Sequence, residues 1–186
     1  MQFKFKHSKI TFNTKAKLVN GLNVTFVFAE DAKSVYQELT KNPQAILVED
    51  LNKLSGLVVH NDTILMSLGA KSKFTSDGLV NVATSLAKFV ASREISEINL
   101  HLTNVHAEKL ALSYAELVEK FIVDFGNGLY YFDDFKTEKT KLALEKVHVS
   151  SDEDLSKALA NAVAILEGYF IVRDLANNPS NVATPS

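Results

Sequence analysis

Apolar residues recur with two different periods along the chain. In short segments they alternate with polar residues, as in half-buried strands, and in longer segments they return every three to four residues, as on one helix face. The strand-like segments are 3–12, 22–29, 63–69, 97–102, 129–132 and 141–149, and the helix-like segments are 32–39, 77–92, 107–124 and 152–176. Because strands alternate with helices of this length, the pattern predicts an α/β layered fold with a mixed or mostly parallel sheet flanked by helices.

Turn residues separate these segments. Asn20-Gly21 is typical of a turn, and the glycine-rich run 126–128 is expected to turn the chain into the aromatic strand at 129–132. Residues 45–48 are a candidate for a short buried strand, whereas residues 49–61 are polar and are expected to be irregular.

Helix ends are marked by their capping residues. Asp31 is expected to open the helix at 32–39, and Ser151 with Asp154 three residues later is typical of a capping box for the last helix. The polar residues 177–186, rich in Asn, Pro and Ser, cannot extend that helix. We therefore predict one domain over 1–176 and, over 177–186, the start of a connection to a further unit.

Composition narrows the class of protein. The 186 residues include 20 Lys and Arg against 22 Asp and Glu, which leaves a net charge of −2 and no general basic field to attract nucleic acid. No cysteine is present, which excludes disulfides, a thiolate nucleophile and cysteine-ligated metals. The N-terminus lacks the apolar core of a signal peptide, and no apolar run has the length of a membrane span. We expect a cytoplasmic protein.

The densest basic region of the chain holds Lys136, Lys139, Lys141 and Lys146. Glu138 and Glu145 interrupt it. We therefore favour a solvated strand edge or loop for this region and keep a polyanion site as the alternative.

The histidines do not form a recognisable metal site. His101 and His106 are five residues apart across a strand-to-helix junction, which is poor spacing for metal ligands. His60 lies in a polar loop, and His148 is expected to face outward on its strand. We expect each imidazole to be hydrogen-bonded or solvated.

The carboxylates, glycines and serines also form no recognisable catalytic or binding motif. Asp133-Asp134 is expected to form a turn, and the acidic run 152–154 is explained by the helix N-terminus that follows it. Gly69 ends a strand, where backbone amides can bind an anion, but residues 70–73 add no further glycine. No serine lies in a Gly-x-Ser-x-Gly elbow. The residues alone therefore predict no catalytic, cofactor-binding or metal-binding residue.

The final segment, Arg173-Asp174-Leu175-Ala176-Asn177-Asn178-Pro179-Ser180-Asn181-Val182-Ala183-Thr184-Pro185, resembles the junction between the two domains of leucyl (cytosol) aminopeptidases. Two weaker matches precede it: Ile64–Gly69 is similar to a family strand that ends in Leu-Gly, and Tyr130–Thr137 is similar to a Tyr-x-Phe-Asp-x-aromatic-Lys-Thr series. The resemblance thus covers nearly the whole chain and is strongest at its end.

The resemblance implies a specific role. In this family the N-terminal domain is similar to macro domains, and a separate catalytic domain holds two divalent metal ions, zinc or manganese, that activate water to cleave peptides. The family is generally hexameric. Its metal and catalytic motifs would fall beyond Ser186, so none is carried onto this sequence. We expect a non-catalytic domain, inactive alone, that serves assembly or access and whose partner is its own catalytic domain.

Two rival functions stay open at this stage. The α/β pattern with Gly69 at a strand end is compatible with an autonomous ligand-binding module of macro-domain type. Some bacterial members of the resembling family also bind DNA, which makes a DNA-binding accessory domain the second rival. The near-neutral charge gives that second rival no support.

Overall fold

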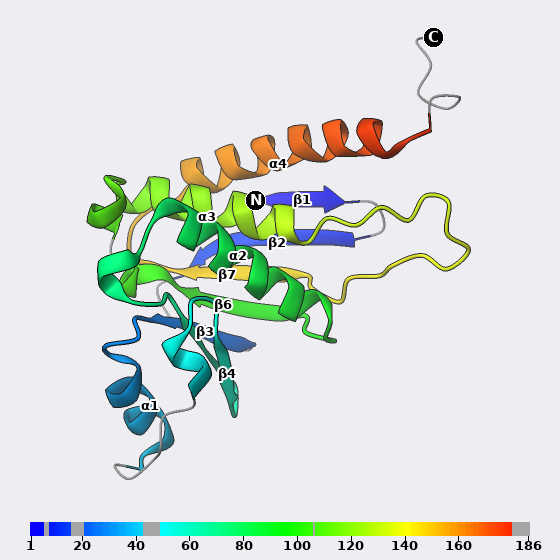
Figure 1. The fold of residues 1–186 in the computed structure, drawn as a ribbon. Helices are drawn as coiled ribbons and strands as arrows, with labels where there is room; N and C mark the ends of the chain where they lie inside the picture. Colours follow the sequence, from blue (N-terminus) through cyan, green and yellow to red (C-terminus); the bar gives the residue numbers. More distant parts are fainter. Residues whose placement is uncertain (6–7, 16–20, 43–48, 106, 180–186) are drawn as a thin grey trace.

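A mixed β-sheet forms the centre of the molecule. Figure 1 shows the computed structural model, which describes residues 1–5, 8–15, 21–42, 49–105 and 107–179. Within these residues the sheet has seven strands in the order β1-β2-β7-β6-β3-β5-β4. The strands are β1 (Gln2–Phe5), β2 (Ser8–Lys15), β3 (Leu22–Val27), β4 (Leu57–His60), β5 (Thr63–Ser67), β6 (Glu97–His101) and β7 (Lys146–Ser150). The five inner strands run parallel and the edge strands β1 and β4 run antiparallel, so the predicted α/β fold is confirmed.

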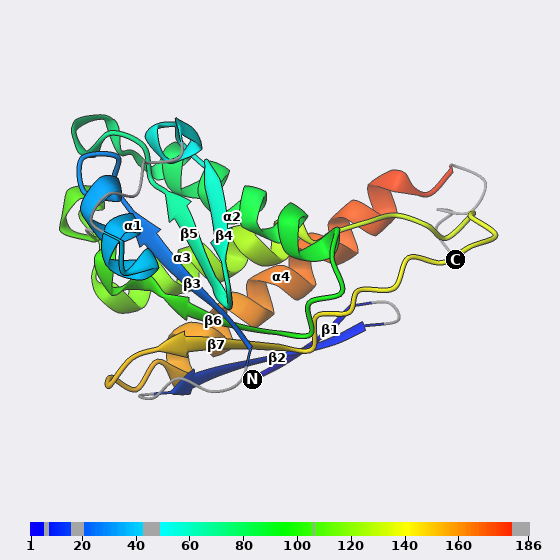
Figure 2. The same cartoon turned by 90° about the horizontal axis from the view of Figure 1, so that it is seen from below.

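Most of the helical residues lie on one face of this sheet. The α-helices are α1 (Ala32–Thr40), α2 (Ser76–Ala91), α3 (Tyr114–Gly128) and α4 (Ser156–Asn177), and the short 3-10 helices are η1 (Glu49–Asn52), η2 (Lys71–Lys73), η3 (Leu102–Asn104) and η4 (Ala107–Leu110). Figures 1 and 2 show α2, α3 and α4 side by side over one face, whereas α1 lies on the opposite side, next to β3 and β5. None of the helices in the described part of the chain is long and apolar enough to cross a lipid bilayer.

The main core lies between the sheet and α2, α3 and α4. The ring of Phe26 on β3 meets that of Phe121 on α3 edge to face, with centroids 5.2 Å apart. Phe3 on β1 meets Phe170 on α4 in the same way at 5.0 Å. Gly126 lets α3 approach α4, because a Cβ atom there would lie 2.5 Å from a methyl group of Leu166. Aromatic packing and one close helix contact thus join the edge strand, the central strands and the helices into one core.

The face of the sheet opposite α2, α3 and α4 has an apolar part and a polar part. Near β3, β5 and β4 it is apolar, and Val27, Leu65, Leu51 and Ala32 form a small core that includes the start of α1. Over β2, β7, β6 and β3 it is polar, with Asn13, His148, Asn99 and Asn23 directly opposite one another across the four strands. In the described ranges no helix covers this polar part (Figure 2).

Three predictions around α3 were wrong. The α-helix begins at Tyr114 rather than at 107, because Ser113 and Glu116 form a capping box there and residues 107–110 form the separate η4. Residues 126–128 continue α3 instead of turning the chain, and 129–132 are not a strand. Glycine has weak helix propensity, but here the tight packing of α3 against its neighbours overrides that preference.

Other boundaries also differ from the prediction. The region 49–61, expected to be irregular, contains η1 and the edge strand β4, and β7 covers only the second half of the strand predicted at 141–149. Asp31 precedes α1 without a side-chain capping hydrogen bond. The strand proposed at 45–48 lies outside the described residues.

The start of α4 also differs from the predicted start at residue 152. The helix begins at Ser156, after Leu155, so Ser151 and Asp154 do not form the predicted capping box. Ser151 Oγ instead accepts a hydrogen bond from the amide of Glu153, and Asp154 Oδ1 accepts one from the amide of Ser156. These two bonds order the turn that leads into α4.

Candidate functional site

The end of α4 is held against the end of α3 by polar side chains. Arg173 donates hydrogen bonds to the backbone carbonyl oxygen of Asn127, at 3.1 Å, and to the side-chain oxygen of the same residue. Its guanidinium carbon also lies 3.9 Å from the centre of the Tyr130 ring. A guanidinium that stacks on an aromatic ring and donates two hydrogen bonds has little freedom to rotate. The last turns of α4 are therefore fixed in direction relative to α3.

Tyr130 is the centre of this arrangement. Its hydroxyl donates to Asp174 Oδ1 at 2.7 Å and accepts a hydrogen bond from Asn177 Nδ2 at 3.1 Å. Its ring packs edge to face on Phe170, with centroids 5.2 Å apart. Asn177 also donates to the carbonyl oxygen of Arg173, one helical turn earlier, at 2.8 Å. We call Asn127, Tyr130, Arg173, Asp174 and Asn177 the Tyr130 cluster.

The Tyr130 cluster joins two segments that carry the family resemblance. Arg173, Asp174 and Asn177 belong to the final resembling segment, and Tyr130 begins the series Tyr130–Thr137. Tyr130 is far from these residues in sequence, since its hydrogen bond with Asp174 spans 44 positions. The resembling residues within the described part of the tail therefore have a structural function: they set where and in which direction α4 ends.

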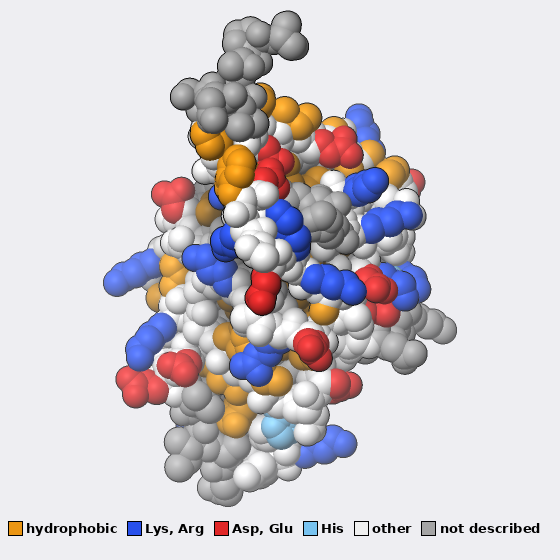
Figure 3. All heavy atoms as spheres, turned by 90° about the vertical axis from the view of Figure 1, so that its right-hand side faces the viewer, with side chains coloured by type: hydrophobic (Ala, Val, Ile, Leu, Met, Phe, Trp, Pro, Cys, Tyr) orange, Lys and Arg blue, Asp and Glu red, His pale blue; other side chains and the backbone are white. Residues whose placement is uncertain are grey.

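Beyond its buried side, α4 exposes several large apolar side chains. These are Ile165, Tyr169, Ile171, Val172 and Leu175, and we call them the α4 apolar surface. Val172 is 64% exposed and Leu175 is 59% exposed, whereas Leu166 and Phe170 of the same helix are buried. Figure 3 shows hydrophobic side chains gathered at the top of the molecule, at the end of α4. A helix that is apolar beyond its buried side is typical of one that a second surface covers.

The loop after Tyr130 is ordered by a buried carboxylate. Asp133 is 1% exposed, and its Oδ2 accepts a hydrogen bond from the amide of Thr140 at 2.6 Å. Lys139 Nζ donates to the carbonyl oxygens of Asp133 and Asp134, each at 2.9 Å. The turn predicted at Asp133-Asp134 is confirmed by the hydrogen bond from the Lys136 amide to the Asp133 carbonyl. Because Asp134 is exposed, the two carboxylates do not share one buried site.

Two cavities lie where the parallel strands end. One of about 460 Å³ lies at the carboxyl end of β3 and is lined by Phe28, Asp31, Ser34 and Thr103, among others. A neighbouring cavity of about 340 Å³ shares Thr103 and is lined by Tyr114 and by the loop after β7. The carboxyl edge of a parallel sheet is the usual ligand position in α/β folds.

The anion position suggested near Gly69 is occupied by the chain itself. Gly69 has a φ of +71°, which glycine adopts easily, and it leads into η2. Both carboxylate oxygens of Glu30 accept a hydrogen bond from the amide of Lys71, at 3.0 Å each. The backbone hydrogen bonds of Glu30 and Lys71 lower the pKa of the Glu30 carboxyl below its ordinary value. The structure therefore gives no support to an external phosphate at this amide.

The described residues contain no group of three or more His, Asp or Glu side chains that could hold a metal ion. His101 is half-buried, and burial lowers its pKa. His106 lies outside the described residues.

His148 was expected to face outward, but it is only 3% exposed. Its Nε2 lies 2.7 Å from Glu97 Oε1, and Lys146 Nζ lies 3.4 Å from the other oxygen of that carboxylate. Burial acts to raise the pKa of Glu97, but the hydrogen bonds from His148 and Lys146 lower it below the ordinary value. The expectation of an outward position was therefore wrong: His148 lies on the helix-free face but is buried beside a carboxylate.

The chain is similar in sequence to proteins named as probable cytosol aminopeptidases. No family model matches the chain. The chain is 29% identical over 129 residues to the probable cytosol aminopeptidase of Rickettsia canadensis (strain McKiel), a match that covers 66% of this chain and 25% of that protein. It is 28% identical over 153 residues to the probable cytosol aminopeptidase of Alkalilimnicola ehrlichii, covering 78% of this chain and 30% of that protein. The chain thus spans less than a third of the length of these relatives.

Solved structures agree on the fold. A mutant of tomato leucine aminopeptidase matches with a TM-score of 0.76 at 17% identity, over 99% of this chain and 41% of that chain. The bottromycin maturation enzyme BotP matches with a TM-score of 0.65 at 17% identity, over 90% of this chain and 35% of that chain. The comparisons thus agree with the resemblance noted in the sequence: the chain is similar in sequence to cytosol aminopeptidases and in fold to a leucine aminopeptidase, which is consistent with the N-terminal domain of that family.

Proposed function

We propose that this chain is the non-catalytic N-terminal domain of a dinuclear-metal leucyl aminopeptidase that removes N-terminal residues from peptides. The α4 apolar surface is the observation that carries the proposal. It lies on the helix that the Tyr130 cluster fixes in direction, and a catalytic domain in the same polypeptide would cover it. The matched relatives extend well beyond the matched part, since the chain spans 25% and 30% of two of them.

In this proposal residues 1–176 form the domain and residues 177–186 begin the connection to the catalytic domain. The two metal ions, zinc or manganese, belong to the catalytic domain, and so do the peptide substrates. The domain described here serves assembly, in a homo-hexamer, or access to the catalytic centre. A cytoplasmic location is supported by the relatives, which are named cytosol aminopeptidases.

The gene sequence beyond the codon for Ser186 gives the first test. We expect it to encode a domain with a lysine- and aspartate-rich metal motif. A reading frame that continues without such a motif would refute the assignment.

Activity gives the second test. Residues 1–186 alone are expected to show no turnover of leucine p-nitroanilide with manganese or zinc, whereas the longer polypeptide is expected to be active. Metal-dependent turnover by residues 1–186 would contradict the non-catalytic role.

Variants of the α4 apolar surface test its role directly. In the longer polypeptide, Val172→Ser with Leu175→Ser is expected to lower activity and the assembled fraction measured by light scattering. In residues 1–186 alone, both side chains are exposed, so the same pair should change the free energy of unfolding by no more than about 0.5 kcal/mol per site. The matched control is Lys157→Ser with Glu167→Ser, two exposed polar positions on α4. An unchanged assembly in the Val172 and Leu175 pair would show that the surface is not an interdomain contact.

A ligand-binding module of macro-domain type is the second candidate, and the cavity of about 460 Å³ at the carboxyl end of β3 is the observation that favours it. Calorimetry with ADP-ribose separates the two functions, because micromolar binding would favour the module. A gel-shift assay at two salt concentrations tests DNA binding, since phosphate contacts weaken as salt rises.

A further inference from the structure

The loop between α3 and β7 carries an exposed aromatic ring. Figures 1 and 2 show this loop, residues 129–145, extending from the same end of the molecule as the last turns of α4. Phe135 lies on it and is 61% exposed, and the centre of its ring lies 5.8 Å from that of Phe132. We call residues 132–140 the Phe135 loop.

The Phe135 loop is held in shape by its own hydrogen bonds. The buried carboxylate of Asp133 accepts one from the amide of Thr140, which joins the two ends of the loop. Lys139 Nζ donates to the carbonyl oxygens of Asp133 and Asp134, so this member of the lysine-rich region is used inside the loop. A side chain on a loop that is already ordered loses less conformational freedom when a partner covers it.

The most exposed large apolar side chains gather at this end of the molecule. Among the described residues four of them are more than half exposed: Phe135 of the loop and Ile171, Val172 and Leu175 of the α4 apolar surface. Apolar side chains that are exposed singly are normal, whereas several of them at one end of a molecule mark an interaction site.

The Tyr130 cluster fixes the loop relative to α4. Tyr130 lies just before the Phe135 loop, and its hydroxyl is hydrogen-bonded to Asp174 and Asn177 in the last turns of the helix. Because the start of the loop and the end of α4 are held together, one rigid partner can contact both.

We propose that the Phe135 loop is a second contact for the catalytic domain in the same polypeptide, with the Phe135 ring held in an apolar hollow of that domain. The proposal rests on the proposed function, in which that domain covers the α4 apolar surface. Since α4 ends at Asn177, beside Tyr130, a domain connected through residues 177–186 would begin next to both surfaces.

The exposed apolar area favours a connected domain over a second copy of the chain. The four most exposed apolar side chains offer together no more than about 600 Å². Each partner in a stable complex of separate chains contributes roughly 800 Å². Contact with a domain of the same polypeptide is intramolecular, so a smaller surface is sufficient.

Thiol labelling tests the proposal, because residues 1–186 contain no cysteine. Lys136→Cys places a reporter beside Phe135, and mass spectrometry of its peptide gives the rate of reaction with N-ethylmaleimide. We expect this rate to be about tenfold or more lower in the longer polypeptide than in residues 1–186 alone, because a covered thiol reacts only when the contact opens. Lys33→Cys, at an exposed position of α1, should react equally in both.

Two substitutions in the longer polypeptide identify the group that makes the contact. Added to Lys136→Cys, Phe135→Ser should raise the labelling rate toward that of residues 1–186 alone, whereas the matched change Glu138→Ser, at an exposed polar position of the same loop, should not. Equal effects of the two substitutions would show that the Phe135 ring is not the contact and would overturn the proposal.

Val172→Cys separates this proposal from the proposed function. If Val172→Cys is protected in the longer polypeptide and Lys136→Cys is not, the interdomain contact of α4 stands and the Phe135 loop has no part in it. If neither is protected, the proposed interdomain contact fails as well. Protection of Lys136→Cys that disappears on dilution would assign the contact to a second copy and overturn the choice of partner.

Discussion

Replacing Tyr130 with phenylalanine removes a single hydroxyl from the Tyr130 cluster. The ring would remain, together with its packing on Phe170 and its stacking with the Arg173 guanidinium. The lost groups are the donor to Asp174 Oδ1, at 2.7 Å, and the acceptor for Asn177 Nδ2, at 3.1 Å. The substitution therefore isolates the polar part of the cluster from its aromatic part.

The expected loss of stability in Tyr130→Phe depends on how exposed the hydrogen-bond partners Asp174 and Asn177 are. A hydrogen bond to a charged group contributes about 1.5–3 kcal/mol, and a neutral one about 0.5–1.5 kcal/mol. Asn177 is exposed and Asp174 is only partly buried, so water replaces much of what is lost. We expect Tyr130→Phe to lower the free energy of unfolding by about 1–2 kcal/mol. For a domain of this size that corresponds to a fall in Tm of roughly 2–8 °C.

Urea titration followed by circular dichroism measures this change. The matched control is Tyr169→Phe on α4, because Tyr169 is 49% exposed and belongs to the α4 apolar surface. The control should lie within about 0.5 kcal/mol of the unmodified chain. If Tyr130→Phe is as stable as Tyr169→Phe, the hydroxyl contributes nothing to stability and its hydrogen bonds do not fix the end of α4.

Three further predictions follow from single sites. Gly126→Ala should lower the free energy of unfolding by about 1–3 kcal/mol in a thermal melt, because the new methyl group would meet Leu166. Burial raises the pKa of Tyr114 from 10.0 to about 12, so stability should fall as pH rises through that interval, and Tyr114→Phe should remove this loss in urea titrations. The pKa of Glu97 is lower in the folded chain than in the unfolded chain, so the charged carboxylate stabilises the fold above its unfolded pKa. This stabilisation is lost as pH falls through the folded pKa, and Glu97→Gln should therefore make stability depend less on pH in the acid range.

The periodicity of the sequence was enough to predict the layered fold. The alternation of strands and amphipathic helices is local, and the inner strands β3, β5 and β6 match the predicted segments closely. The predicted element boundaries are wrong where tertiary packing determines the backbone conformation. Residues 126–128 resemble a turn, yet they continue α3, and glycine at 126 and 128 leaves room for Leu166 and Ala87, which an added Cβ would meet. The residues that pack against a glycine come from distant parts of the chain, so the local sequence does not predict them.

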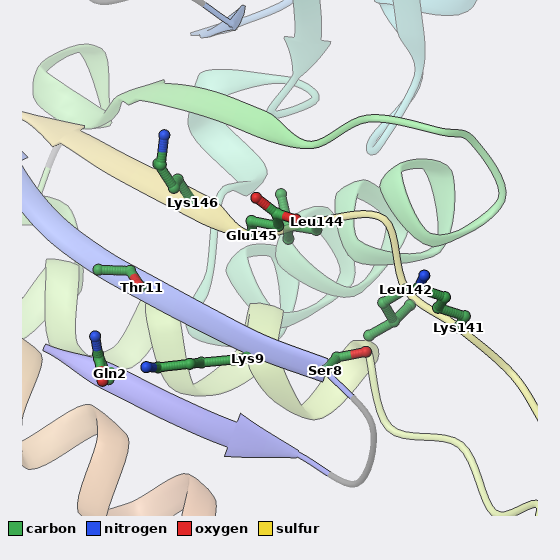
Figure 4. A pocket seen from close by; sticks show the side chains of 9 residues that line it. All are labelled: Gln2, Ser8, Lys9, Thr11, Lys141, Leu142, Leu144, Glu145 and Lys146. Atoms are coloured by element: carbon green, nitrogen blue, oxygen red, sulfur yellow. The ribbon is translucent and has the colours of Figure 1, made fainter.

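The candidate sites were less predictable for the same reason. Tyr130 belongs to a resembling segment, but its hydrogen-bond partner lies 44 positions later. A cavity of about 410 Å³ where β2 and β7 begin is lined by Lys9 and, at its other end, by Lys141, which are separated by most of the chain (Figure 4). The sequence showed only the lysines of one segment and left the choice between solvent and polyanion open. Residues 141–146 line the cavity because the strand order places β7 next to β2.

The Tyr130 cluster also changes what the resembling tail signifies. Read as a motif, Arg173, Asp174 and Asn177 mark a junction to another domain. In the structure each of them contacts Tyr130, so they define the last turn of α4 before any second domain is considered. Under the proposed function a connection to a second domain would leave α4 in one direction, and the hydrogen bonds of this cluster hold the final turn of α4 within residues 1–177.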